Sequence, residues 1–215
     1  MKSILTFLGV FLISASCAAQ NTTKYNNFWN WFSKHDNELY DFEKDQEKIF
    51  DNLQAELQKI DSNLTFEFGP KENGKREFVI SADGILSSFP SVESLYASKP
   101  IFKKWVIVKF RPRRNIDLDF EIGGLKITQK DLKFALMNDN DPKKIGIALF
   151  IRGYNKSQSA LYRRACYVIL DGLIGEYDME TKVGSINIYD FVSDKMKYAS
   201  GIENLSTQFD AASHN

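Results

Sequence analysis

Residues 64–82 read LTFEFGPKENGKREFVISA, and this stretch decides the class of fold. Apolar residues alternate with polar ones over 64–68, which is typical of a strand with one buried face. Gly69-Pro70 is expected to end that strand, and the polar run KENG over 71–74 is typical of a hairpin loop. Residues 77–82 are the expected partner strand, with Phe78 and Ile80 on one face and Val79 on the other. The stretch therefore predicts two paired antiparallel strands.

A long amphipathic helix is predicted immediately before the hairpin, over residues 36–60, because apolar residues recur there at steps of three, four or seven. These residues are Leu39, Phe42, Ile49, Leu53, Leu57 and Ile60. A shorter helix is predicted near 25–34. Its aromatic residues, Phe28, Trp29, Trp31 and Phe32, either dock this helix on the sheet or leave an aromatic surface for a partner.

After the hairpin, the patterns predict more strands than helices. Apolar residues on both faces make 103–110 a candidate central strand. Further strands are expected at 118–122, 126–137, 145–151 and 183–191, with helices at 91–98 and 157–174. We therefore expect an α+β fold: a mainly antiparallel sheet covered by a long N-terminal helix and a buried C-terminal helix.

The expected domain organisation begins with a secretory signal over residues 1–19, where Lys2 precedes a short apolar run and several small residues. Cleavage after Ala19 would release a periplasmic or secreted protein beginning at Gln20. The alternative is lipidation of Cys17, which is the only route by which we expect membrane attachment. A leader and aromatic segment over 20–35, a single domain over 36–192 and a fraying polar tail over 193–215 would follow.

The composition excludes several classes of protein. The 215 residues include 28 basic and 28 acidic side chains, so no global field attracts nucleic acid. Cys166 is the only cysteine outside the signal, which rules out an internal disulfide and favours a buried, inert thiol. His35 and His214 are the only histidines, too few for a structural zinc site. We expect no metal and no cofactor.

One dense basic patch, Arg111, Arg113 and Arg114, follows the strand at 103–110. Guanidinium groups pair well with carboxylates and phosphates, so the patch is a candidate site for a small anionic ligand or an acidic protein partner. The alternative is a set of internal ion pairs with Asp117, Asp119 and Glu121, which lie just downstream.

An acidic set, Asp171, Glu176, Asp178 and Glu180, lies around the end of the helix at 157–174. Paired carboxylates act as general acids and bases or bind hard cations. Asp83, in the turn after the hairpin, is a further candidate. The alternative for the acidic set is a solvated helix end, and for Asp83 a plain strand end and turn.

Four segments resemble an uncharacterised bacterial family, a domain of unknown function. They are EFGP at 67–70, REFVISADGI at 76–85, Trp105 with FRPRR at 110–114, and LDGLIGEYD at 170–178. The resemblance covers most of the chain after the signal. It implies no activity, cofactor or substrate, so it assigns no functional residue.

Two hypotheses of function follow. The first is an exported, non-catalytic binding or interaction module of the bacterial envelope, with Arg111, Arg113, Arg114, Asp83, Glu176 and Asp178 as candidate binding residues. The second is a hydrolase that uses Asp83, Asp171, Glu176 or Asp178, with or without a metal ion. Convergence of the carboxylates in one cleft would favour the hydrolase.

Overall fold

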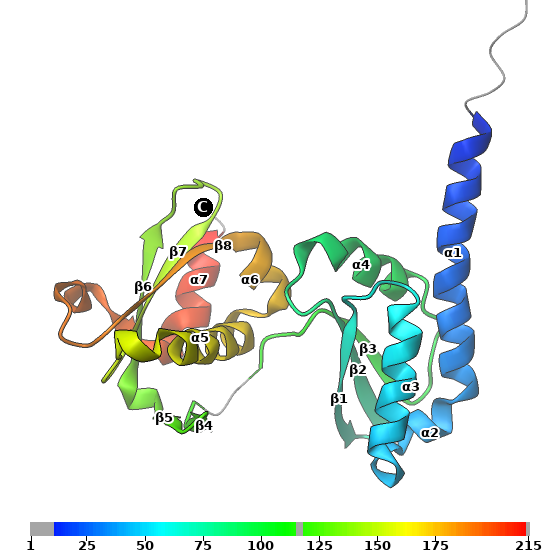
Figure 1. Ribbon diagram of the computed structural model, residues 1–215, viewed down its shortest axis with the longest axis horizontal. Helices are drawn as coiled ribbons and strands as arrows, with labels where there is room; N and C mark the ends of the chain where they lie inside the picture. The colour runs from blue at the N-terminus through cyan, green and yellow to red at the C-terminus, as the bar shows by residue number, and fades with distance from the viewer. Residues whose placement is uncertain (1–10, 115–117, 214–215) are drawn as a thin grey trace, which may run out of the picture. The chain divides into compact units, whose positions relative to one another are not determined.

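Figure 1 shows a computed structural model that describes residues 11–114 and 118–213, without the side chains of residues 11–22 and of Phe120. The protein has an α+β fold. Where the sequence predicts a single domain over 36–192, the described chain divides into two compact units, and the second begins at Phe110. Half of the expected signal, residues 1–10, lies outside the described residues, and its remainder is described only as helical backbone.

The first unit contains a three-stranded sheet in the order β1-β2-β3. β1 (Thr65–Glu72) and β2 (Lys75–Ser81) are antiparallel, and β3 (Trp105–Lys109) is parallel to β2. Its helical segments are α1 (Phe11–Lys34), α2 (Asp36–Tyr40), η1 (Phe42–Lys44), α3 (Gln46–Gln58), η2 (Leu86–Ser88) and α4 (Phe89–Ala97).

The predicted hairpin is confirmed, with one difference. Asn73 and Gly74 adopt φ values of 51° and 73°, the left-handed pair that a tight two-residue hairpin turn requires. Pro70 does not end β1. Instead the register shifts between Phe68 and Lys71, and the strand continues to Glu72. This bulge accommodates Pro70, because a residue in a bulge is not paired with the neighbouring strand and proline has no N–H to donate.

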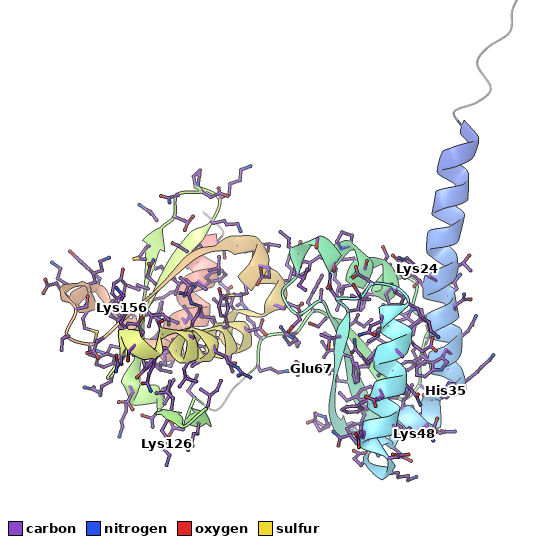
Figure 2. The ribbon with its side chains drawn as sticks, in the orientation of Figure 1. Lys24, His35, Lys48, Glu67, Lys126 and Lys156 are labelled. Atoms are coloured by element: carbon purple, nitrogen blue, oxygen red, sulfur yellow. The ribbon has the colours of Figure 1, made fainter. Side chains whose placement is uncertain are left out.

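Aromatic packing joins α1 and α3 to one face of this sheet. Phe28 and Phe32 of α1 are buried, and the Phe32 ring lies 5.0 Å from that of Phe78 on β2. Phe50 of α3 lies 5.1 Å from Phe66 on β1. Lys24, labelled in Figure 2, donates to the carbonyl of Ile60 at 3.0 Å and ties α1 to the end of the α3 segment. The aromatic cluster therefore docks α1 rather than awaiting a partner.

Two expectations for this unit were wrong. The helix over 36–60 is interrupted, since η1 separates α2 from α3 and lets the Phe42 ring pack 4.8 Å from Phe50. β3 is an edge strand, not a central one, and Val106 is exposed on it. The central strand is β2, which is buried from Phe78 to Ser81.

The second unit contains a four-stranded mixed sheet in the order β8-β7-β6-β9 and a separate hairpin, β4-β5. Its elements, in chain order, are β4 (Phe120–Ile122), β5 (Leu125–Ile127), η3 (Gln129–Asp131), β6 (Leu132–Asn138), β7 (Ile145–Ile151), η4 (Lys156–Gln158), α5 (Ser159–Ile174), α6 (Glu176–Lys182), β8 (Val183–Tyr189), η5 (Asp194–Tyr198), β9 (Ser200–Gly201), η6 (Ile202–Asn204) and α7 (Leu205–Ser213). Because β7 and β8 run parallel, as do β2 and β3, both sheets are mixed and not simply antiparallel.

The core of the second unit lies between its sheet and two helices. α5 contributes Ala165, Cys166 and Ile169, which pack with Phe134 of β6 and Leu149 of β7. The expected buried helix is thus confirmed as α5. It is not the last helix of the chain, because α7 follows and shares the same core.

The C-terminal segment was expected to fray, and this expectation was wrong. β9 pairs with β6, and α7 packs against the core through Leu205 and Phe209, both fully buried. Ile202, Leu205 and Phe209 recur at steps of three and four, which places them on one face of a helical turn and its continuation. The sequence prediction missed this apolar face because the residues between these three are polar, so the composition of residues 193–215 as a whole is polar.

Candidate functional site

The segment 111–114 is bound along its backbone to the junction between α5 and α6. Glu176, at the start of α6, donates its N–H to the carbonyl of Arg111 at 2.9 Å. Its Oε2 accepts the N–H of Arg111 at 2.8 Å. Arg114 donates its own N–H to the carbonyl of Gly172 at 2.8 Å. Since Glu176 is fully buried, its carboxylate is a fixed part of this attachment.

The arginine side chains continue the same pattern. Nε of Arg111 lies 2.7 Å from Oδ2 of Asp171. Arg113 donates through Nε to the carbonyl of Ile174 at 2.6 Å and pairs with Asp178 at 3.0 Å and with Asp210 at 2.7 Å. These side chains are only partly exposed. Through these contacts, residues of α5, α6 and α7 are all bound to the segment 111–114.

Arg111 and Arg113 therefore form internal ion pairs, which was one of the two interpretations of the basic patch. Their partners differ from the expected ones. Asp119 accepts the backbone N–H of Gln129 at 2.8 Å, Glu121 faces Lys126 at 3.7 Å, and Asp117 lies outside the described residues. The actual partners of Arg111 and Arg113 lie 60 to 97 positions along the chain. Local sequence could not show them, because only the packing of α5, α6 and α7 brings them near.

The electrostatics of this network stabilise the charged form of Arg113 and the neutral form of Glu180. A hydrogen bond and ion pair with Asp210, together with Asp178, raise the pKa of Arg113 despite partial burial. Burial raises the pKa of Glu180, the remaining member of the acidic set.

Asp83 belongs to the first unit, in the turn that follows β2. It adopts a φ of 50°, and its N–H donates to Oγ of Ser81 at 3.0 Å, which is the geometry of a tight turn. The four carboxylates of the hydrolase hypothesis therefore come from two units. Over residues 11–114 and 118–213, no group of three His, Cys, Asp or Glu side chains is arranged to hold a metal ion.

The remaining single candidates are structural. Cys166 is buried, and desolvation raises the pKa of its thiol to about 12, so it stays protonated at neutral pH. His35 follows α1 directly (Figure 2), where its ring stacks on Trp31 at 4.5 Å and its Nδ1 lies 2.8 Å from the carbonyl of Trp31. Neither side chain faces a nucleophile–base partner.

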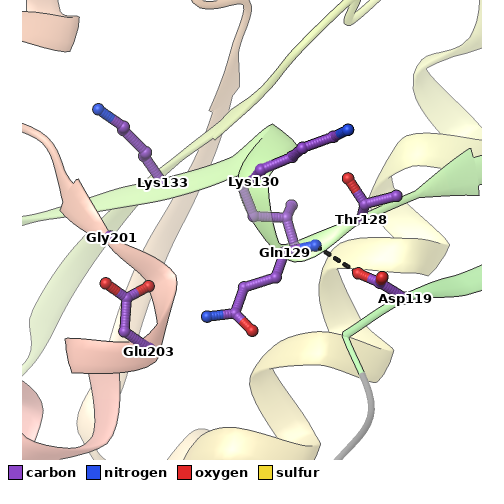
Figure 3. A pocket seen from close by; sticks show the side chains of 8 residues that line it. Asp119, Thr128, Gln129, Lys130, Lys133, Gly201 and Glu203 are labelled. Carbon is purple, nitrogen blue, oxygen red and sulfur yellow. Dashed lines mark hydrogen bonds between the residues drawn. The ribbon is translucent and has the colours of Figure 1, made fainter.

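An open pocket of about 590 Å³ lies on the second unit beside the start of β6. Figure 3 shows Gln129 and Glu203 beside it, while the ammonium ends of Lys130 and Lys133 point away from each other. A hydrogen bond joins the Gln129 N–H to Asp119, another lining residue. The pocket offers separate charges of both signs on an open surface, but no convergent set for one ligand group.

A smaller and more enclosed groove, of about 170 Å³, lies between α5 and β8. Its lining residues are Tyr154, Ser159, Arg163, Cys166, Tyr167, Ile186, Asn187 and Ile188. The lining contains one cation and no carboxylate. It adjoins the edge of the sheet, because β8 pairs with β7 alone.

Sequence reasoning did not find this groove. The signal that could have pointed to it is the composition of β8, VGSINIY, which has no charged residue and no proline. Edge strands are usually protected by such residues. The sequence did not show that β8 is an edge strand, because strand order is a property of the assembled sheet.

The fold and the groove define an α+β protein with two mixed-sheet units and a strand edge next to a helix. Comparison with protein-family models, with curated proteins and with solved structures found no match to this chain. Within the part of the chain that the structure describes, no helix is both long and apolar enough to cross a membrane.

Proposed function

We propose that this protein is an exported, non-catalytic interaction module that binds another protein along β8 of its second unit. The single observation that carries the proposal is the unprotected edge of β8 beside the groove lined by α5. The unpaired N–H and carbonyl groups of an edge strand are a template for a further strand. Grooves beside such edges let side chains of the added strand contribute specificity.

The alternative, a hydrolase using a carboxylate cluster, has less support. Asp171 and Asp178 are held by Arg111 and Arg113, and the carboxylate of Glu176 is bound to backbone. These contacts join elements of the fold and leave the groups engaged. A general base must also lie within reach of a substrate, and neither of the two pockets described above is lined by Asp83, Asp171, Glu176 or Asp178. The same contacts favour a structural role for the basic patch over capture of a partner.

Strand addition can be tested with a library of displayed peptides selected on the immobilised full-length chain. We expect selected peptides to lose binding when Asn187→Lys places a charge on the edge of β8, since charged residues block edge pairing. Asn140→Lys is the matched control, because Asn140 is an exposed residue of the β6–β7 turn and does not line the groove. Selected peptides that bind the Asn187→Lys variant normally would refute the proposed function.

Export is the second part of the proposal, and it is supported by the signal pattern over residues 1–19. Mass spectrometry of the protein purified from its bacterial source should show an N-terminus at Gln20. An N-terminus at Cys17 carrying a lipid would identify a membrane-anchored lipoprotein instead. An intact Met1 would contradict export by this route.

A further inference from the structure

We infer that the groove between α5 and β8 selects an extended peptide segment in which an acidic side chain pairs with Arg163 and apolar side chains flank it two positions away. The inference rests on the proposed function and names the class of partner that the site would take. It follows from three properties of the groove: its backbone, its apolar lining and its charge.

The backbone of β8 is regular where it borders the groove. The register with β7 shifts between Ile145 and Ile147, at the start of β8, where Asp139 accepts the N–H of Ser185 at 2.7 Å. From Ile186 to Tyr189 each residue pairs in sequence with a residue of β7. An added strand can therefore align with this half of β8 over several residues, because no bulge twists it away.

The apolar lining comes from residues that share one face. Ile186 and Ile188 are two positions apart on β8, so their side chains project to the same side of the sheet. Both pack against the core covered by α5, and Tyr167 of α5 and Tyr154 face the same groove. An added strand would direct every second side chain into this space. Apolar residues at that spacing would remove the exposed parts of these side chains from water.

The charge of the groove is that of Arg163. No described carboxylate lies within ion-pair distance of Arg163, and none lines the groove. The guanidinium acts close enough to Cys166 to oppose the burial effect on its pKa. Arg163 is exposed, and a guanidinium binds a carboxylate through two parallel hydrogen bonds. An acidic side chain on the groove face of the added strand is the complementary group.

The probes are two synthetic peptides, acetyl-TVTETVT-amide and its glutamine counterpart, acetyl-TVTQTVT-amide. In an extended strand their Val, Glu or Gln, and Val residues share one face. Each is titrated into the ¹⁵N-labelled full-length chain and followed by NMR. We expect amide shifts at Ile186–Tyr189 and along the groove side of α5, with the glutamate peptide binding about threefold to tenfold more tightly.

Arg163→Gln should abolish this preference while leaving the affinity for the glutamine peptide unchanged. Arg164→Gln is the matched control, because Arg164 is the neighbouring exposed arginine of α5 and does not line the groove. It should keep the preference. This comparison isolates the charge pair from any general effect of a lost arginine on the helix.

Three outcomes overturn the inference in distinguishable ways. Equal binding of the two peptides to the unmodified chain refutes the acidic specificity but keeps strand addition. Failure of both peptides, together with an empty peptide selection, refutes the proposed function itself. Concentration-dependent dimerisation of the chain alone, lost in the Asn187→Lys variant, would show that a second copy occupies the edge.

Discussion

Glu176 is a carboxylate with no exposure to solvent, and its Oε2 accepts the backbone N–H of Arg111 at 2.8 Å. A charged side chain is rarely buried unless its hydrogen-bonding capacity is used. Here the carboxylate of Glu176 accepts the N–H of Arg111 in place of the backbone carbonyl that would accept it in a strand or helix. Residues of this kind look catalytic in a sequence because catalysis and structure use the same carboxylates.

Replacing this residue, Glu176→Ala, should lower the free energy of unfolding by about 2 to 3 kcal/mol, because the N–H of Arg111 would remain buried without its acceptor. Urea denaturation followed by circular dichroism measures the change. Glu121→Ala is the control, since the side chain of Glu121 is about half exposed and its ion pair with Lys126 is long, at 3.7 Å. It should change stability by less than about 0.5 kcal/mol. Equal effects of the two variants would contradict a structural role for Glu176.

The first unit makes a prediction about pH. The hydrogen bond from Arg76, whose side chain is almost fully buried, lowers the pKa of Glu43 from 4.5 to about 2. The hydrogen bond from Lys71, followed by that from Lys44, lowers the pKa of Asp41 from 3.8 to about 2. Groups with a lowered pKa in the folded state stabilise it above their unfolded pKa and lose this effect as the pH falls.

Stability of the first unit should therefore fall as the pH drops from about 4.5 toward 2, the interval between the ordinary and the folded pKa values of these carboxyls. Urea titrations at a series of pH values, followed by Trp fluorescence, measure this slope. The double variant Asp41→Asn with Glu43→Gln should be less stable at pH 7 and show a shallower slope. An unchanged slope would mean that other carboxyls control acid unfolding.

At the scale of the element, α7 is held by a few large side chains. Phe209 is fully buried in the same core as Phe134 and Leu149, although α7 follows a polar, irregular stretch. Nearly all the stability of so short a helix comes from such packing, because isolated helices of this length are marginal in water.

Phe209→Ala should accordingly cost about 3 to 5 kcal/mol of stability, the usual penalty for emptying an aromatic site in a core. Thr207→Ala, at an exposed position of the same helix, should change it by less than about 0.5 kcal/mol. Denaturant unfolding of the two variants makes the comparison. A small effect of Phe209→Ala would support the fraying tail that the composition of residues 193–215 predicts.

At the scale of the whole molecule, each unit has a sheet, covering helices and a core of its own. A chain of roughly one hundred residues is long enough to bury a self-sufficient core. The single domain expected from the sequence missed this division, because no proline-rich or glycine-rich linker separates Lys109 from Phe110.

Fragments covering residues 23–109 and 110–213 should each fold and unfold cooperatively. Circular dichroism during thermal and urea unfolding provides the measurement, with the full-length chain as reference. A fragment that shows no cooperative transition, while the full-length chain does, would mean that its core depends on the other half.

Local pattern was enough to predict the hairpin at 64–82, α5 and β7, because periodicity of apolar residues indicates which side of an element is buried. The single strand predicted over 126–137 was wrong, since the structure divides this range into β5, η3 and β6. It did not indicate which neighbour buries that side. The interruption of the helix at Phe42 and the edge position of β3 both depend on contacts with distant residues, Phe50 and β2 among them.

The sequence by itself determined the α+β class, the hairpin with its loop within residues 71–74 and the burial of Cys166, since each follows from residues that are neighbours in the chain. Only the tertiary structure decided that Arg111 and Arg113 meet Asp171, Asp178 and Asp210. It also decided that β8 ends a sheet beside Arg163. The physical reason is that ion-pair partners and strand order depend on which elements pack together, and such long-range contacts leave no periodic trace along the chain.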